Sequence, residues 1–282
     1  KGGVLVMKIP FVKMHGLGND FVLLDCVRQT LPIHQGLVRS LCDRRHGIGA
    51  DQLLVLEPSK KADFRMRVFN ADGGEVEMCG NGIRCLAKYL VTQTLLPEGE
   101  QAIETKAGIM RPRVEGGRIT VDMGVPELEG PKIPVRLQGR IVDREVTLAN
   151  EQRRITCVSM GNPHCVIFTE NLAACPVRQL GPKIEADALF PRRVNVEFVQ
   201  AESPARISMR VWERGAGETA ACGTGACAAA VASVLTGRTG RDLVVALPGG
   251  ELSIRWDEDG HVLMTGPAEE VFRGEIDVER TR

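Results

Sequence analysis

The sequence lacks a long hydrophobic run, an excess of charge of either sign, and any Cys-x-x-Cys pair. No apolar stretch approaches the ~18 residues that a membrane-spanning helix needs. Lys+Arg and Asp+Glu are equal at 36 each, so no net field attracts nucleic acid or an anionic membrane. The apolar run near the beginning is too short for a signal peptide, and Met7 is the expected start of the natural chain. We therefore predict a cytoplasmic protein with no membrane and no nucleic-acid partner.

Nine cysteines are present, and their number is odd. Disulfide frameworks belong to small, loop-rich secreted chains, whereas this chain has 282 residues, which predicts two domains. The absence of Cys-x-x-Cys removes the usual signature of zinc knuckles and thioredoxin-like proteins. We expect most of these cysteines to be small buried hydrophobic residues and predict no metal site.

The sequence repeats itself at an offset of 143 residues. Arg67-Val68-Phe69 matches Arg210-Val211-Trp212, and Cys79-Gly80-Asn81-Gly82 matches Cys222-Gly223-Thr224-Gly225 at the same offset. Several matches in one register are difficult to explain by chance, even in a glycine-rich chain. The repeat therefore predicts two similar halves that arose by an internal duplication.

Each half combines short strands with one apolar helix. Alternating or β-branched runs predict strands at residues 21–25, 52–57, 64–70, 119–122, 155–159, 194–199, 206–212, 243–247 and 261–265. Each helix is expected to begin at the Cys-Gly-x-Gly motif, and Gly225–Leu235 is apolar on all sides, as a fully buried helix is. We predict an α+β protein with two pseudo-symmetric domains, each a β-rich, barrel-like sheet around a central helix. The three prolines of Val125–Pro134 suggest an interdomain linker there.

Cys79 and Cys222 each precede a predicted helix. Helix N-termini carry unpaired N–H groups and a partial positive charge, which lower a thiol pKa and bind anions. The neighbouring glycines allow the backbone to approach a ligand closely. The sequence therefore predicts two reactive thiols, each beside an anion-binding helix start.

The repeat implies a pseudo-twofold relation between the two cysteines, which we expect to face each other across a cleft. One thiolate can then remove a proton from a stereocentre while the opposite thiol delivers one to the other face. N–H donors at the helix starts would stabilise the carbanion intermediate. This arrangement is typical of an enzyme that inverts a carbon centre.

Polar side chains also recur at the 143-residue offset, and one arginine does not. The matched pairs are Asn19 with Asn162, Gln52 with Asn195, and Asn70 with Glu213. Arg214 corresponds to Ala71, so we expect it to have an asymmetric role, such as binding a second carboxylate. These residues are candidates for substrate binding.

The motifs together resemble the diaminopimelate epimerase family from Met7 nearly to the end of the chain. The matching segments are residues 14–21 (MHGLGNDF), 49–52 (GADQ), 69–75 (FNADGGE), 78–82 (MCGNG), 161–164 (GNPH), 194–195 (VN), 213–219 (ERGAGET) and 221–225 (ACGTG). The resemblance implies interconversion of LL- and meso-diaminopimelate in lysine and peptidoglycan precursor synthesis, without pyridoxal phosphate or a metal.

The resemblance also implies roles for individual residues. Cys79 and Cys222 are the acid and base, and the backbones of Gly80-Asn81 and Gly223-Thr224 hold the reacting carboxylate. His164 and Glu213 tune the thiol pKa values. The rest of the substrate is bound by Asn19, Gln52, Asn70, Asn162, Asn195, Glu213 and Arg214.

The family fold implies an N-terminal epimerase domain at residues 7–125 and a C-terminal one at residues 126–266. It also implies that the tail, residues 267–282, returns to the first domain and that the protein forms a homodimer.

Two alternatives remain at this stage. A proline or hydroxyproline racemase shares the two-thiol logic, but its first motif usually reads Cys-Gly-His-Gly, whereas position 81 is asparagine here. A redox or metal-binding module is the other alternative. Cys85 and Cys227 follow their motif cysteines at different spacings, which favours packing roles over paired ligands.

Overall fold

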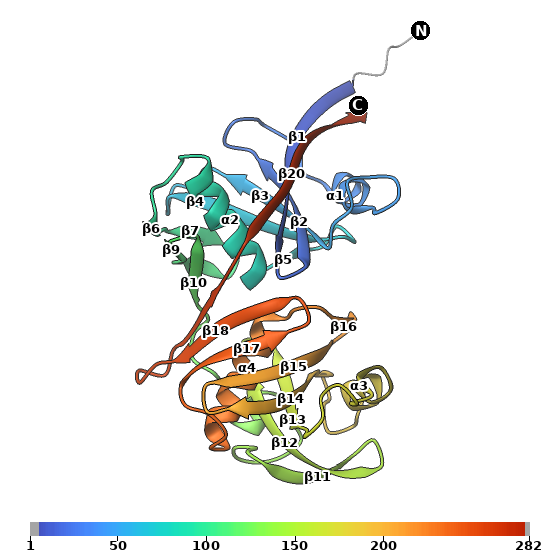
Figure 1. Cartoon of the computed structure of the whole chain (residues 1–282). Helices are drawn as coiled ribbons and strands as arrows, with labels where there is room; N and C mark the ends of the chain where they lie inside the picture. The colour runs from blue at the N-terminus through green and yellow to red at the C-terminus, as the bar shows by residue number, and fades with distance from the viewer. Residues whose placement is uncertain (1–5, 280–282) are drawn as a thin grey trace. The chain divides into compact units, whose positions relative to one another are not determined.

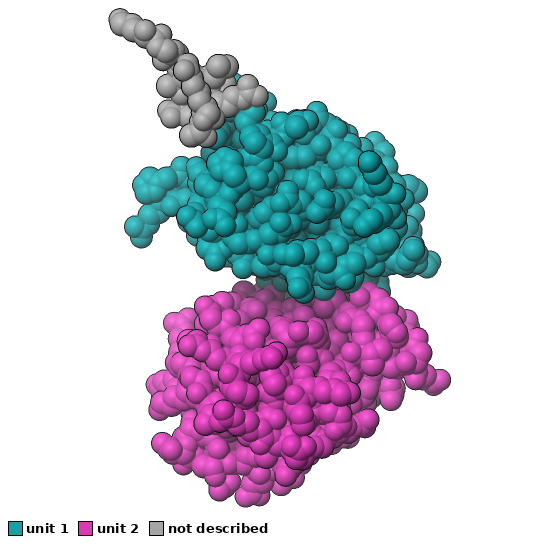
Figure 2. All heavy atoms as spheres, turned by 180° about the vertical axis from the view of Figure 1, so that it is seen from behind, with its two compact units in different colours: residues 1–121, 267–282 teal, residues 122–266 magenta. Residues whose placement is uncertain are grey.

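The computed structural model describes residues 6–279. Residues 1–5, which precede the predicted start at Met7, and the last three residues of the predicted tail lie outside this range. The described chain divides into two compact units (Figure 2). Unit 1 runs up to Val121 and resumes at Pro267, and unit 2 is the continuous stretch Asp122–Gly266.

Unit 1 contains an eight-stranded sheet in which seven strands follow the order β20-β1-β2-β3-β4-β7-β8 and β5 pairs with β4 (Figure 1). Its strands are β1 (Val6–Gly16), β2 (Asn19–Asp25), β3 (Gln52–Glu57), β4 (Phe64–Asn70), β5 (Glu75–Val76), β7 (Ile103–Thr105), β8 (Gly108–Met110) and β20 (Glu269–Glu279). The helices are α1 (Gln35–Cys42) and α2 (Gly80–Thr92). The short strand β9 (Arg113–Glu115) pairs with both β6 (Gly99–Glu100) and β10 (Arg118–Asp122).

Unit 2 has neighbouring strands in the order β11-β12-β13-β14-β15-β17-β18-β19, and β16 pairs with β15. Its strands are β11 (Arg144–Leu148), β12 (Glu151–Ser159), β13 (Pro163–Phe168), β14 (Asn195–Ser203), β15 (Arg206–Glu213), β16 (Gly217–Thr219), β17 (Asp242–Leu247), β18 (Gly250–Trp256) and β19 (Val262–Gly266). Its helices are α3 (Val177–Glu185), α4 (Gly223–Leu235) and the 3₁₀ turn η1 (Gly130–Lys132).

The two units share one topology. The helices α2 and α4 begin and end 143 residues apart, as the sequence repeat predicts. The parallel pair β2–β3 places Phe21 opposite Gln52, and the parallel pair β13–β14 places His164 opposite Asn195, which is the same register. The predicted α+β fold, with two pseudo-symmetric domains around central helices, is confirmed.

All nine predicted strands and both helices are present, but several elements were not predicted. The unpredicted elements include α1, α3, β1, β13, β18 and β20. The linker prediction was wrong, because residues 125–134 are packed within unit 2. Glu127 forms a β-bridge with Ser159, and Ile133 is buried.

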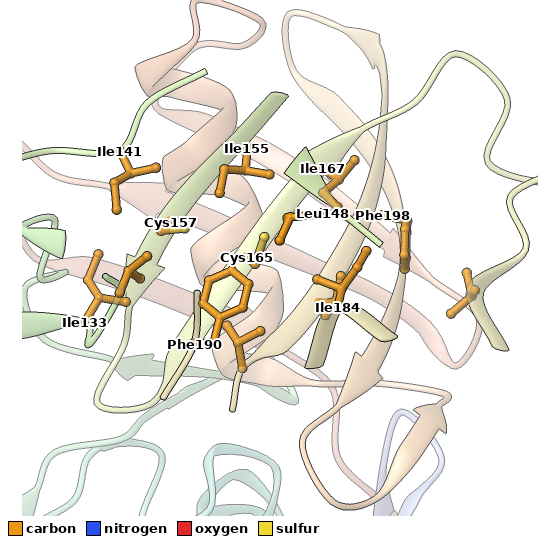
Figure 3. Packing of buried hydrophobic residues seen from close by; sticks show 14 of the residues in the cluster. Ile133, Ile141, Leu148, Ile155, Cys157, Cys165, Ile167, Ile184, Phe190 and Phe198 are labelled. Carbon is orange, nitrogen blue, oxygen red and sulfur yellow. The ribbon is translucent and has the colours of Figure 1, made fainter. Parts of the chain in front are cut away.

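The central helix of unit 2 is buried because nearly every side chain is small. Residues Ala226–Ala232 of α4 are at most 1% exposed, and the helix packs against strands from β12 to β19. A second cluster of unit 2 gathers around α3 and includes Ile184, Phe190 and the cysteines Cys157 and Cys165 (Figure 3). Cys85 and Cys227 are also fully buried in the helices, as their packing role predicts.

The chain returns to unit 1 after completing unit 2. Strand β20 runs antiparallel to β1, with paired residues from Val6–Glu279 to His15–Glu269 and a bulge at Lys13/Met14. Arg84 of α2 donates a hydrogen bond to the carbonyl of Pro267 at 3.2 Å. Unit 1 is therefore completed by residues that follow unit 2 in the sequence.

No helix within residues 6–279 has the length and apolar character needed to cross a membrane.

Candidate active site

Cys79 and Cys222 occupy the N-cap positions of α2 and α4. Both have extended backbone angles, φ −138° and ψ 118° at Cys79 and φ −134° and ψ 111° at Cys222, and neither side chain caps its helix. The first N–H groups of each helix are therefore left for other acceptors. In unit 2, the backbone N–H of Gly225 is close enough to the Cys222 thiol to favour the thiolate form.

The predicted polar residues of unit 1 lie at strand ends near α2. Asn19 begins β2 directly after a turn in which Leu17 and Gly18 have φ of 56° and 85°. Gln52 begins β3 and pairs in register with Asn70 at the end of β4. Because β2 and β3 are parallel, Asn19 and Gln52 lie at the same edge of the sheet.

Asn19 connects Cys79 to the start of α2. Its Oδ1 accepts from Cys79 Sγ at 3.9 Å and from Asn81 Nδ2 at 3.1 Å. Gln52 and Asn70 form a separate pair, with Nε2 of Gln52 donating to Oδ1 of Asn70 at 2.8 Å. The buried Oε1 of Gln52 meets no donor among the described residues, so its hydrogen-bonding capacity is unfilled.

A charged network that the sequence analysis missed fixes the side chain of Asn19 through its amide nitrogen. Asp51 Oδ2 accepts from Asn19 Nδ2 at 3.0 Å, and Arg44 bridges Asp51 and Asp20 at 2.7 and 2.6 Å. Lys13 also donates to Asp20. Burial alone raises the pKa of Asp20, but Arg44, Lys13 and the backbone N–H of Asp51 outweigh it and hold that pKa well below its usual range. The network belongs to unit 1 alone, since residues 156, 163, 187 and 194 of unit 2 are Thr, Pro, Asp and Val.

In unit 2, a chain of hydrogen bonds leads to Cys222. His164 Nε2 lies 3.0 Å from Asn162 Oδ1, and Asn162 Nδ2 donates to Thr224 Oγ1 at 3.3 Å. Thr224 Oγ1 lies 3.5 Å from Cys222 Sγ. Four residues predicted from the sequence are thus brought together at the start of α4.

This chain of hydrogen bonds begins at Glu197, a residue that the sequence analysis did not select. Its Oε1 lies 2.7 Å from His164 Nδ1, and both side chains are fully buried. The two halves differ here, because positions 21 and 54 of unit 1 hold Phe and Leu where unit 2 has His164 and Glu197. Titratable residues at strand positions that are apolar in the other half were the signal that could have revealed this pair.

The remaining predicted residues of unit 2 adjoin the same strand ends. Asn195 Nδ2 donates to the Pro163 carbonyl at 2.9 Å, and its Oδ1 accepts from the Arg214 backbone N–H at 2.9 Å. Glu213 accepts a hydrogen bond from Thr219. The guanidinium of Arg214 is exposed and donates to the Arg192 carbonyl at 3.1 Å. It thus retains donors for an anion.

The expected low thiol pKa was wrong for Cys222. Its burial, together with the Glu213 carboxylate, raises its pKa well above the usual value, and donors from Thr224 and Gly225 offset this only in part. The helix start therefore does not dominate the electrostatics at this thiol. The neutral thiol is the favoured form of Cys222 in this conformation.

Comparison with known proteins identifies the family to which the sequence belongs. The sequence pattern of diaminopimelate epimerase matches residues 11–129 and 156–271. This chain belongs to the diaminopimelate epimerase family. The family's curated members include the enzyme of Moorella thermoacetica, which is 55% identical over 95% of this chain and 99% of its own length. The diaminopimelate epimerase of Pelotomaculum thermopropionicum is 54% identical over 94% of this chain and 98% of its own.

Solved structures outside the diaminopimelate epimerases share the fold at low identity. A phenazine biosynthesis protein of Bacillus anthracis superimposes with a TM-score of 0.70 at 19% identity, covering 96% of this chain and 99% of its own. A hydroxyproline epimerase of Agrobacterium vitis gives 0.68 at 13% identity, over 97% and 93% of the two chains. These likenesses support the fold of this epimerase family member.

The metal-binding alternative finds no cluster to support it in the part of the chain that the structure describes. Residues 6–279 contain no group of three or more His, Cys, Asp or Glu side chains arranged to hold a metal ion.

Proposed function

We propose that this chain interconverts LL-2,6-diaminopimelate and meso-2,6-diaminopimelate by a two-base mechanism in which Cys79 and Cys222 exchange protons with the α-carbon. The observation that carries the proposal is sequence similarity to diaminopimelate epimerases over nearly the whole chain. The equivalent placement of two thiols at the starts of α2 and α4 supports it. The reaction serves lysine and peptidoglycan precursor synthesis.

The chemistry follows from the two helix starts. A thiolate removes the α-proton from one face, and the other cysteine, as a neutral thiol, donates a proton to the opposite face. The negative charge that develops spreads into the adjacent carboxylate, where the backbone N–H groups of Gly80-Asn81 and Gly223-Thr224 stabilise it. These donors need no cofactor, so pyridoxal phosphate and metal ions are not required.

Other residues bind the distal part of the substrate and tune the thiols. The exposed guanidinium of Arg214 suits the second carboxylate, and Glu213 suits the distal ammonium group. The amide side chains supply the remaining hydrogen bonds; they belong to Asn19, Gln52, Asn70, Asn162 and Asn195. His164 and Glu213 tune the thiol pKa values, and Glu213 raises that of Cys222.

The resting protonation states follow from the surroundings of Cys222. Since burial and the Glu213 carboxylate raise the pKa of Cys222, this cysteine begins the cycle as the proton donor. Cys79 then acts as the first base.

Incorporation of solvent deuterium at Cα of LL-diaminopimelate, without added cofactor, tests the proposal. We expect rapid incorporation by the reduced protein and strongly impaired epimerisation in both Cys79→Ser and Cys222→Ser. Dialysis against a chelator should leave the rate unchanged. Turnover of proline or hydroxyproline with no incorporation into diaminopimelate would overturn the assigned substrate.

The proposal also covers the domain boundaries, the cellular location and the oligomeric state. The two epimerase domains are residues 7–125 with the tail 267–282, and residues 126–266. The protein is a cytoplasmic homodimer. Exposed Val271 and Phe272 on β20, an edge strand of the unit 1 sheet, support a contact between copies along this edge.

A further inference from the structure

The carboxyl group of Glu197 is buried beside Cys222. Its Oε1 lies 2.7 Å from His164 Nδ1, and no described donor reaches its buried Oε2. A methyl group added at Gly225 would lie 2.9 Å from Glu197 Oε1 and 3.3 Å from Cys222 Sγ, so the carboxyl group and the thiol flank the same position. Glu197 therefore adjoins the proposed proton donor although it has no assigned role in the proposed reaction.

The hydrogen-bond chain fixes where the protons of this group lie. Asn162 Nδ2 donates to Thr224 Oγ1, so Asn162 Oδ1 is the acceptor that faces His164. His164 Nε2 must then carry a hydrogen. One more proton lies between His164 Nδ1 and Glu197 Oε1, either as an imidazolium–carboxylate pair or as a neutral imidazole and a carboxylic acid.

The surroundings favour the neutral form of this pair. An ionised carboxylate would leave a charged Oε2 buried without a donor, which costs more than leaving a neutral carbonyl oxygen unpaired. Burial raises the pKa of Glu197, and the nearby Glu213 carboxylate adds to this, whereas His164 and the backbone N–H of Glu197 oppose it. The titratable groups around Glu197 are His164 and Cys165 on β13, Glu213 on β15 and Cys222 at the start of α4.

Resting on the function proposed above, we infer that Glu197 is a protonated carboxylic acid that donates to His164 Nδ1 and so sets the donor direction of the chain ending at Cys222. His164 donates to Asn162, Asn162 donates to Thr224, and the Thr224 hydroxyl is left to donate to the Cys222 sulfur. Glu197 is thus a positioning residue for the reaction.

The corresponding site of unit 1 lacks the His164–Glu197 pair, and its hydrogen bonds run in a different direction. Phe21 and Leu54 occupy the two positions there, and Gly82 lies against the Leu54 side chain. Asn19 turns its Oδ1 toward Cys79 and its Nδ2 toward Asp51, so this amide accepts on the thiol side. The amide Asn162 instead donates on the thiol side, which makes the two sites chemically different although their backbones correspond.

Substitutions of Glu197 test whether its side chain must donate a hydrogen bond to His164. In Glu197→Gln, the side-chain amide N–H still donates to His164 Nδ1, so the chain keeps its direction. In Glu197→Ala, His164 can move its hydrogen to Nδ1, Asn162 then turns its amide, and the Thr224 hydroxyl donates to Asn162 Oδ1. The Cys222 thiolate loses a donor, and its pKa rises.

We expect Glu197→Gln to retain kcat within about threefold and Glu197→Ala to lose at least about tenfold, with KM within about twofold for both. Alkylation rates measured per cysteine by mass spectrometry should show the pH midpoint of Cys222 rising by about one unit in Glu197→Ala. Cys79, in the same molecules, should keep its midpoint. Glu202→Gln, an exposed carboxylate on the same strand, is the matched control and should behave as wild type.

Infrared difference spectra between wild type and Glu197→Gln test the protonation state directly, without substrate. At about pH 7, the wild type should show a carboxylic-acid C=O band that the variant lacks. Carboxylate bands alone, or an equal loss of kcat in Glu197→Gln and Glu197→Ala, would overturn the inference. If Glu197→Ala does not fold, the infrared comparison alone decides. Because the spectra and alkylation use no diaminopimelate, a wrong substrate assignment would leave them unaffected.

Discussion

Arg84 carries a charge into the interior of unit 1. Its side chain is fully buried and donates to Asn81 Oδ1 at 2.8 Å and to the carbonyls of Gly80 and Pro267. The arginine thus connects the start of α2, where Asn81 lies, with the returning C-terminal segment. Fixing Asn81 also fixes one of the side chains that contact Asn19.

Replacing this arginine should weaken both stability and catalysis. Arg84→Met keeps much of the volume but leaves buried acceptors unpaired, so we expect a loss of about 3 kcal/mol in the free energy of unfolding. Urea unfolding followed by circular dichroism measures this. The control is Lys88→Met on the same helix, where a half-buried side chain should change stability by less than about 0.5 kcal/mol. Equal effects of the two substitutions would contradict the role of Arg84.

Asp20 should make stability depend on acid pH. Its folded pKa is held below the unfolded value, so it stabilises the protein above about pH 4, and this contribution is lost as pH falls further. Asp20→Asn should cost about 2 kcal/mol near neutrality, and the difference from wild type should shrink below about pH 4. Unfolding midpoints across this pH range provide the measurement. A difference that stays constant with pH would show that the cost does not come from the charge.

Residue identities at the site were more predictable than their electrostatics. Cys222 was selected from the repeat, but its thiol pKa depends on burial and on the Glu213 carboxylate, which comes from strand β15. Charge–charge distances of this kind are set by packing, and one motif does not encode them. The network around Asp20 was missed for the same reason, because Lys13, Arg44 and Asp51 approach one another only after the strands pair.

At the scale of elements, the strands and central helices followed from periodicity and from the glycine-flanked cysteines. The helices α1 and α3 did not, because they are only 8 and 9 residues long and α3 contains an internal proline. Strand β20 was missed because most of its exposed residues are charged and its pairing partner, β1, is at the other end of the chain. Long-range pairing of this kind leaves little local signal.

The first turns of α2 and α4 offer a matched comparison. A methyl group at Gly82 would meet the end of the Leu54 side chain at 3.0 Å, whereas one at Gly225 would meet Glu197 Oε1 at 2.9 Å and Cys222 Sγ at 3.3 Å. We expect Gly225→Ala to destabilise the protein by about 1–3 kcal/mol and to lower kcat, because it displaces both groups. Gly82→Ala should cost less than about 1 kcal/mol, since a flexible leucine can move. Thermal unfolding and steady-state rates test whether Gly225→Ala has the larger effect. A larger effect of Gly82→Ala would be incompatible with these contacts.

At the scale of the molecule, unit 2 is continuous and unit 1 is not. We expect residues 122–266 to fold cooperatively when expressed alone, whereas residues 1–121 should not, because β1 lacks β20. Joining residue 121 to residue 267 through a short glycine linker should restore folding of unit 1. Circular dichroism and urea titration of the three fragments distinguish these cases, and a cooperative transition for residues 1–121 alone would contradict the need for β20.

Association of two copies should depend on the β20 edge. Phe272→Lys places a charge among the exposed apolar residues of that strand, and we expect it to shift the protein from dimer to monomer in analytical ultracentrifugation. Ile109→Lys, at the opposite edge strand β8, is the control and should leave the dimer intact. Dissociation by the second substitution alone would move the proposed contact to the other edge.

The discontinuity of unit 1 has a consequence for how the chain emerges from the ribosome. Strand β1 is made first, but its partner β20 is synthesised only after all of unit 2. Unit 2 can therefore finish folding during translation, while the half made earlier waits with one edge of its sheet open. A pause or truncation late in translation would thus leave a completed second half attached to an unfinished first half, a species that chaperones and proteases would recognise.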